Sequence, residues 1–115
     1  MIRQLEMFYY ANQDRDFEYG TWDCSIFVKE WFEFVHCKKI EIDRFDKENV
    51  SIIDNMDRYL NRTVKQWTGN IALFKSDKPT LGIIKDNMIL ALSPTGITAV
   101  KNKPLIMWSI KSCRQ

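Results

Sequence analysis

The apolar pattern of the chain changes near Trp67–Asn70, and this change constrains the fold more than any other feature. Before it, apolar residues recur every three or four positions, which is typical of amphipathic helices. After it come short β-prone runs separated by Pro, Gly, Asp and Asn. Helices followed by strands predict an α+β fold in which N-terminal helices pack on a C-terminal antiparallel β-sheet. At 115 residues the chain is expected to form one domain, 1–115, with a core of its own.

Three segments have helical spacing. The first runs from Ile2 to about Tyr10, and the polar run Asn12–Asp16 is expected to end it. The second, from Thr21 to about Val35, is the most regular and is expected to be the central helix. The third lies between Val50 and Leu60, and the charged segment Lys38–Phe45 is expected to form an exposed connection before it.

Five strands are expected after Gly69. They are Ile71 to Phe74, Leu81 to Lys85, Met88 to Leu92, Ile97 to Val100 and Leu105 to Ile110. Turn-forming residues separate them, at Lys85-Asp86-Asn87 and at Pro94-Thr95-Gly96.

Charge and cysteine usage argue against several classes of function. The 17 basic residues are scattered against 15 acidic ones, which does not favour a nucleic-acid partner. The cysteines Cys24, Cys37 and Cys113 form no CxxC pair, so neither a metal site nor a disulfide framework is expected, and no cofactor is expected. Charged residues in Met1–Glu6 and the lack of a long apolar run argue against a signal peptide and against membrane insertion. The chain is expected to fold in a reducing cytoplasm.

Cys24 is the candidate nucleophile, because a glycine-bearing turn places it at the start of the central helix. Backbone N–H groups at a helix start have no intrahelical partner and the dipole there is positive, which favours a thiolate and tends to lower the pKa of the thiol. The only histidine, His36, lies twelve positions further along the same helix, or roughly 18 Å away. A nucleophile and its base must lie within about 3 Å of one another. His36 is therefore expected to be a structural or surface residue.

Two readings of Cys24 and its neighbours stay open. Cys24 is either a nucleophile or a small buried apolar residue beneath the sheet. Thr21 or Asp23 can cap the helix, and Asp23 could also raise the thiol pKa; capping is the expected role of Asp23. Trp67 and Trp108 belong either to an interface or to the core. Most aromatic residues with helical spacing are expected in the core, although they could line a groove; they are Phe8, Tyr9, Trp22, Phe27, Trp31 and Phe34.

Tyr19-Gly20 precedes Asp23-Cys24-Ser25 at the head of a helix, and a run of short strands follows. This order resembles the NlpC-type branch of papain-like cysteine peptidases, and most of all the small versions that phages and gene-transfer agents encode among their tail genes. Asn70–Phe74 is similar to the first core strand of that family, and Leu81–Ile84 to the strand that opens with its catalytic histidine. The resemblance runs from about residue 2 to residue 110.

The resemblance implies that two catalytic positions are lost. It places the base at Thr80 and the polar residue that orients the base near Ala91, and neither side chain can do that work at neutral pH. Of the catalytic set, Cys24 alone is retained, either as a nucleophile or as a vestige, with Tyr19, Asp23 and Ser25 as the other family-site positions.

The function that follows from the resemblance is structural. The chain is expected to be a catalytically impaired papain-like domain, used for protein–protein interaction as a virion or tail component that binds other phage structural proteins, the tail or connector subunits. The alternative is an active cysteine hydrolase that cleaves the peptide stems of peptidoglycan during infection, with Cys24 as nucleophile. A third possibility is a cytoplasmic assembly factor absent from the finished particle.

Overall fold

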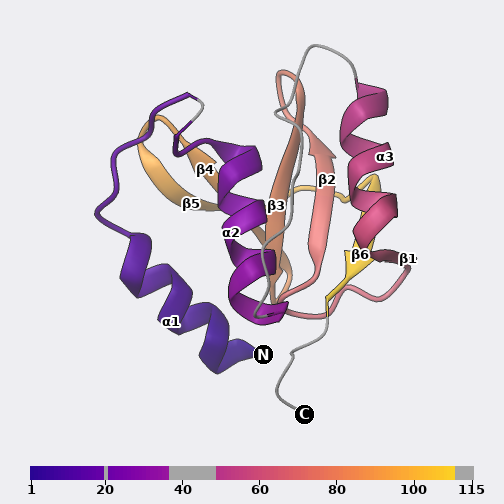
Figure 1. The fold of residues 1–115 in the computed structure, drawn as a ribbon, viewed down its shortest axis with the longest axis horizontal. Coiled ribbons are helices and arrows are strands. Elements are labelled where there is room, and N and C mark those ends of the chain that lie inside the picture. Colours follow the sequence, from indigo (N-terminus) through magenta and orange to yellow (C-terminus); the bar gives the residue numbers. More distant parts are fainter. Residues whose placement is uncertain (20, 37–48, 111–115) are drawn as a thin grey trace.

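The computed structural model describes residues 1–19, 21–36 and 49–110. In chain order the elements are α1 (Ile2–Asn12), α2 (Cys24–His36), α3 (Asn49–Tyr59), β1 (Asn61–Thr63), β2 (Ile71–Lys75), β3 (Pro79–Lys85), β4 (Met88–Ser93), β5 (Gly96–Val100) and β6 (Ile106–Ser109). The expectation of an α+β fold with helices first is confirmed (Figure 1). Within these residues, no helix is long and apolar enough to cross a bilayer.

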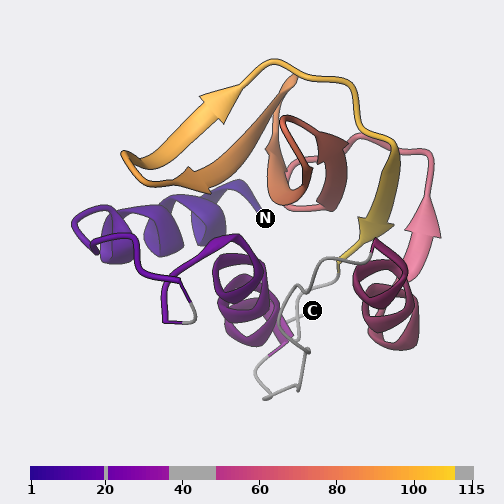
Figure 2. The ribbon, with the colours of Figure 1, turned by 90° about the horizontal axis from the view of Figure 1, so that it is seen from above.

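The strands form one antiparallel sheet in the order β1-β6-β2-β3-β4-β5. Strand β6 lies between β1 and β2, next to the edge of the sheet, and pairs with both. The sheet is strongly twisted, since β4 and β5 run across the view in Figure 2 while β2 and β3 are seen nearly end-on. All three helices lie on one side of it (Figure 2).

Apolar side chains point to both faces of the sheet, because successive residues of the central strands are all apolar. Ile71 and Leu73 of β2 belong to the main core beneath the helices, whereas Ala72 and Phe74 belong to a second cluster. Successive side chains of a strand point to opposite faces, so the second cluster lies on the face away from the helices. Strands β3 and β4 share this pattern, which explains why they read as nearly continuous apolar runs.

Trp31 anchors α2 to the sheet. Its side chain is fully buried, and its indole N–H donates a hydrogen bond of 2.9 Å to the carbonyl oxygen of Gly69, just before β2. The same aromatic cluster includes Phe8 of α1, whose ring centroid lies 5.4 Å from that of Trp31. One side chain thus fixes α2 against both α1 and the first long strand.

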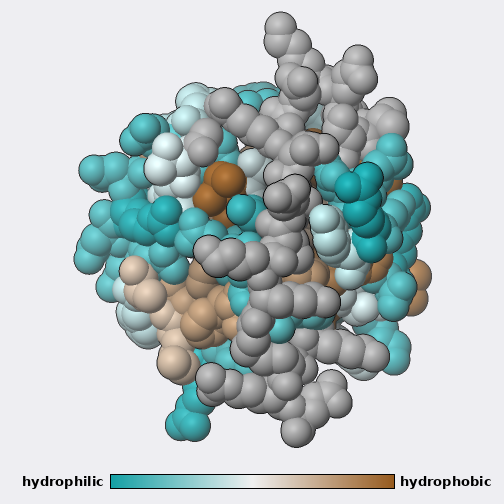
Figure 3. Space-filling view, in the orientation of Figure 1, coloured by the Kyte–Doolittle hydropathy of each residue, from teal (hydrophilic) through white to brown (hydrophobic). Residues whose placement is uncertain are grey.

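Three expectations need correction or completion. The short strand β1 was not expected, and Trp67, with 63% of its surface exposed, is not a core residue, whereas Trp108 is fully buried. Phe34 is 42% exposed, and Figure 3 shows apolar colour gathered over α1 and the neighbouring part of α2. The predicted connection Lys38–Phe45 lies outside the described residues, as do Gly20, Cys37 and Cys113.

Candidate functional site

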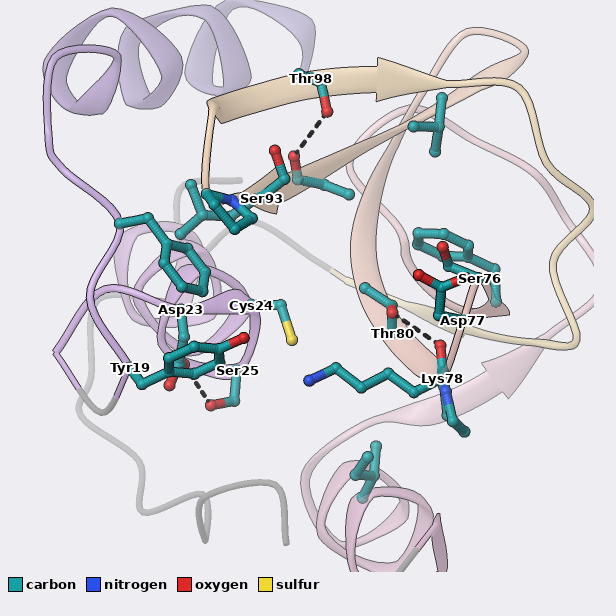
Figure 4. A pocket seen from close by; sticks show the side chains of 18 residues that line it. Tyr19, Asp23, Cys24, Ser25, Ser76, Asp77, Lys78, Thr80, Ser93 and Thr98 are labelled. Carbon is teal, nitrogen blue, oxygen red and sulfur yellow. Dashed lines mark hydrogen bonds between the residues drawn. The ribbon is translucent and has the colours of Figure 1, made fainter. Parts of the chain in front are cut away.

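A pocket of about 410 Å³ opens where the head of α2 meets the β2–β3 turn and the adjoining parts of β4 and β5 (Figure 4). It brings together every described position that the sequence placed in the site. These are Tyr19, Asp23, Cys24, Ser25, Thr80 and Ala91. Segments separated by more than fifty residues therefore converge on one cavity, although that convergence alone assigns no chemistry.

A tight turn carries Tyr19 to the rim of the pocket. Its two ends, Glu18 and Trp22, exchange backbone hydrogen bonds of 3.0 and 2.8 Å. Trp22 is buried, and the guanidinium of Arg15 lies 3.6 Å from the centroid of one of its rings. Arg15 also forms an ion pair of 2.9 Å with Glu30 of α2, so the turn is held against the helix that bears Cys24.

Asp23 caps α2, as the sequence predicted. Its Oδ1 atom accepts hydrogen bonds from the backbone N–H of Ile26, at 3.1 Å, and from the hydroxyl of Ser25, at 2.7 Å. The carbonyl of Asp23 accepts the first helical bond, from the N–H of Phe27. This is the geometry of an aspartate N-cap, and it makes Cys24 the first residue of the helix.

The Cys24 thiol is half-buried and its pKa is raised. Burial is the main cause, and the negative charge of Asp23 adds to it. A backbone hydrogen bond from Leu81 and the positive charge of Lys78 act in the opposite direction but do not overcome burial. The expectation of a lowered thiol pKa is therefore wrong, because burial outweighs the lowering effect of the backbone N–H of Cys24 at the helix start. At neutral pH the group is a thiol, which is a far weaker nucleophile than the thiolate.

The pocket residues at the family's base positions supply no base. Thr80 lies on β3 and its hydroxyl donates a hydrogen bond of 3.0 Å to the carbonyl of Lys78. Ala91 lies on β4, nearly buried, and offers only a methyl group. His36, the only histidine of the chain, is at the far end of α2, where its ring stacks on Phe32 with centroids 4.2 Å apart. The distance argument made from the sequence therefore holds.

Lys78 is the pocket residue that sequence reasoning missed. It belongs to the turn between β2 and β3, and its amine points toward the sulfur of Cys24 (Figure 4). The Nζ atom lies 5.6 Å from the centroid of the Tyr19 ring, a weak cation–π contact. The available signal was its position two residues before Thr80, in the connection between two predicted strands.

The remaining wall is partly apolar and partly hydroxylic. Phe17 and Phe74 contribute aromatic surface, while Ser93 and Thr98 bring hydroxyl groups from β4 and β5. Thr98 donates a weak hydrogen bond of 3.5 Å to the carbonyl of Ala91. Across residues 1–19, 21–36 and 49–110, no group of three His, Cys, Asp or Glu side chains is placed to hold a metal ion.

Neither the models of known protein families nor the curated proteins give a match to this chain. Its function must be argued from the pocket itself.

Proposed function

We propose that this chain is a phage virion or tail component built on a papain-like, NlpC-type fold whose site no longer hydrolyses amides. One observation carries the proposal. Cys24 faces a pocket in which Thr80 and Ala91 stand where the sequence resemblance expects a base and the group that orients it. A cysteine with a raised pKa and no histidine beside it is not an activated nucleophile of the papain type.

In this proposal the pocket binds a partner protein without cleaving it, which suits a structural role. The partners in this proposal are the tail or connector subunits of the same particle, and the chain assembles with them in the host cytoplasm. The virion assignment rests on the resemblance of Tyr19-Gly20 and Asp23-Cys24-Ser25 to small tail-encoded members of the family. Detection of the chain in purified particles distinguishes a virion component from a transient assembly factor.

The absence of hydrolysis is tested with purified peptidoglycan and with its isolated stem peptides. The wild-type chain and the Cys24→Ala variant are expected to release the same background of products by mass spectrometry. Cys24→Ser serves as a second control, because it keeps a hydroxyl of similar size in the pocket. Products that appear with the wild type and disappear in both variants would overturn the proposal.

The alignment of Thr80 with the lost base has its own test. In a Thr80→His variant, an imidazole would enter the pocket opposite Cys24, and the apparent pKa of the thiol is expected to fall because an imidazolium stabilises the thiolate. Thr98→His is the matched control, since Thr98 also lines the pocket but comes from β5. An unchanged Cys24 pKa in Thr80→His, or an equal fall in both variants, would contradict the alignment.

The second candidate is an active cysteine hydrolase that cleaves peptidoglycan stem peptides. The observation in its favour is that Lys78 and the backbone of Leu81 both lower the pKa of Cys24, so some thiolate stabilisation is present. In that reaction the thiolate attacks the amide carbon and nearby backbone N–H groups hold the oxyanion. Its base is either an unrecognised group of this chain or a histidine of a neighbouring subunit, because His36 lies at the far end of α2. The same Cys24-dependent cleavage assay decides between the two candidates.

A further inference from the structure

Lys78 places a positive charge in a pocket that Asp23 and Asp77 also line, and neither of these carboxylates forms an ion pair with it. It is the only lysine or arginine among the described residues that line the cavity, and none of the described carboxylates forms an ion pair with it. The neighbouring Asp77 carboxylate points to the other side of the turn, while the amine of Lys78 points toward Cys24 (Figure 4). Asp23, which precedes α2, accepts hydrogen bonds from the Ser25 hydroxyl and from the backbone N–H of Ile26. The charge is therefore available to an anionic ligand.

The rest of the cavity suggests what that ligand carries besides an anion. Its volume of about 410 Å³ lies within the range of small-molecule and side-chain pockets. Phe17, Phe74 and Pro94 give it apolar walls, and the hydroxyls of Ser93 and Thr98 lie at the opposite side from Lys78. A group with a charged end and a short apolar body matches this division.

We propose that the pocket binds a carboxylate group of a partner polypeptide, with the amine of Lys78 as its ion-pair partner and Cys24 beside the bound group. This inference rests on the proposed role of the chain as a protein-binding module and names the chemistry that its pocket recognises. The carboxylate belongs either to the end of a partner chain or to an acidic side chain, and both sources offer the same two oxygens to Lys78.

Cys24 itself can report on this recognition, because it lies in the same cavity as Lys78. Iodoacetate and iodoacetamide alkylate the same thiolate, but only iodoacetate carries a carboxylate. The rate constants of both reagents at Cys24 are measured by peptide mass spectrometry in the folded protein and again in denaturant. Any effect of Lys78 on the thiolate fraction cancels in the ratio of the two rates, so the ratio reports carboxylate recognition alone.

The folded protein is expected to favour iodoacetate about fivefold more than the denatured chain does, the factor expected for an ion pair at a partly exposed site. The preference is expected to vanish in Lys78→Met, persist in Lys78→Arg and shrink as salt is raised. Lys78 is exposed, so these variants are expected to fold as the wild type does. A ratio that is the same in folded wild type, denatured wild type and Lys78→Met would overturn the proposal.

Competition distinguishes the two sources of the carboxylate. N-acetyl-leucine presents a chain-end carboxylate, the α-amide of N-acetyl-glutamate presents only a side-chain carboxylate, and N-acetyl-leucinamide presents neither. Protection of Cys24 from iodoacetamide by either acid, but not by the neutral amide, supports the proposal and identifies the source. Equal protection by all three, or by none, contradicts it. Cleavage of peptidoglycan would overturn the proposed function without altering these ratios, so the two failures are distinguishable.

Discussion

Replacing Asp23 separates its role in capping α2 from its electrostatic effect on Cys24. In Asp23→Ala the backbone N–H of Ile26 loses its acceptor, and loss of an N-cap costs about 1 kcal/mol. The buried hydroxyl of Ser25 also loses its 2.7 Å hydrogen bond, which costs about 1 kcal/mol more. The free energy of unfolding is therefore expected to fall by about 2 kcal/mol, equivalent to a fall of about 8 °C in Tm for a chain of this size.

Asp23→Asn is expected to behave differently, because asparagine caps helices about as well as aspartate. It keeps an acceptor for Ile26 and Ser25 but removes the negative charge that raises the pKa of Cys24. The stability should change little, while the apparent pKa of the thiol should fall and alkylation near neutral pH should become faster.

Urea unfolding and the pH dependence of Cys24 alkylation measure the two effects separately. Asp77→Asn is the matched control: Asp77 also lines the pocket, but it neither caps a helix nor contributes to the pKa of Cys24. The reasoning is refuted if Asp23→Ala unfolds within 0.5 kcal/mol of the wild type, a difference of about the size seen for ordinary surface substitutions. It is also refuted if Asp23→Asn leaves the alkylation profile unchanged.

Two further substitutions test the fold. In Gly82→Ala the new Cβ would lie 2.6 Å from the carbonyl oxygen of Leu90, so β3 and β4 must separate locally, and urea unfolding should show a loss of about 1 to 3 kcal/mol; a wild-type midpoint would contradict the packing of these strands. Hydrogen bonds from Arg62 and then from Trp108 lower the pKa of Asp57 to about 2, so the stabilisation is present above about pH 4 and is lost as the pH falls toward 2. Asp57→Asn should therefore be less stable than the wild type at pH 6, by a small amount because the pair is exposed, and the difference should shrink toward pH 2. A constant difference across that range would refute this linkage.

The fold could be predicted where periodicity is strong. The central helix and its Asp23 cap were readable because the apolar stripe and the capping residue are local signals. Strand β1 was missed because Asn61–Thr63 is three polar residues without alternation, and it exists only because it pairs with β6. Tertiary pairing of this kind leaves no local trace in the sequence.

Part of the candidate site could also be predicted, because it carries local sequence signals. The motif around Cys24 and the start of the strand at Thr80 identified residues that do share one pocket. The contribution of Lys78 depends on the conformation of the β2–β3 turn, which residue types alone did not indicate. The sign of the Cys24 pKa shift was wrong because burial, which no local motif reports, outweighs the helix terminus.

The proposed function requires that Cys24 is not activated as a nucleophile. The pH dependence of Cys24 alkylation in the folded protein tests this most directly, with Cys37 and Cys113 in the same digests and the denatured chain as reference. The account predicts an apparent pKa above the value of about 8.5 for a free thiol, and slow labelling at neutral pH that accelerates on unfolding. Fast labelling of Cys24 with an apparent pKa well below that of a free thiol would contradict the account and favour a working hydrolase.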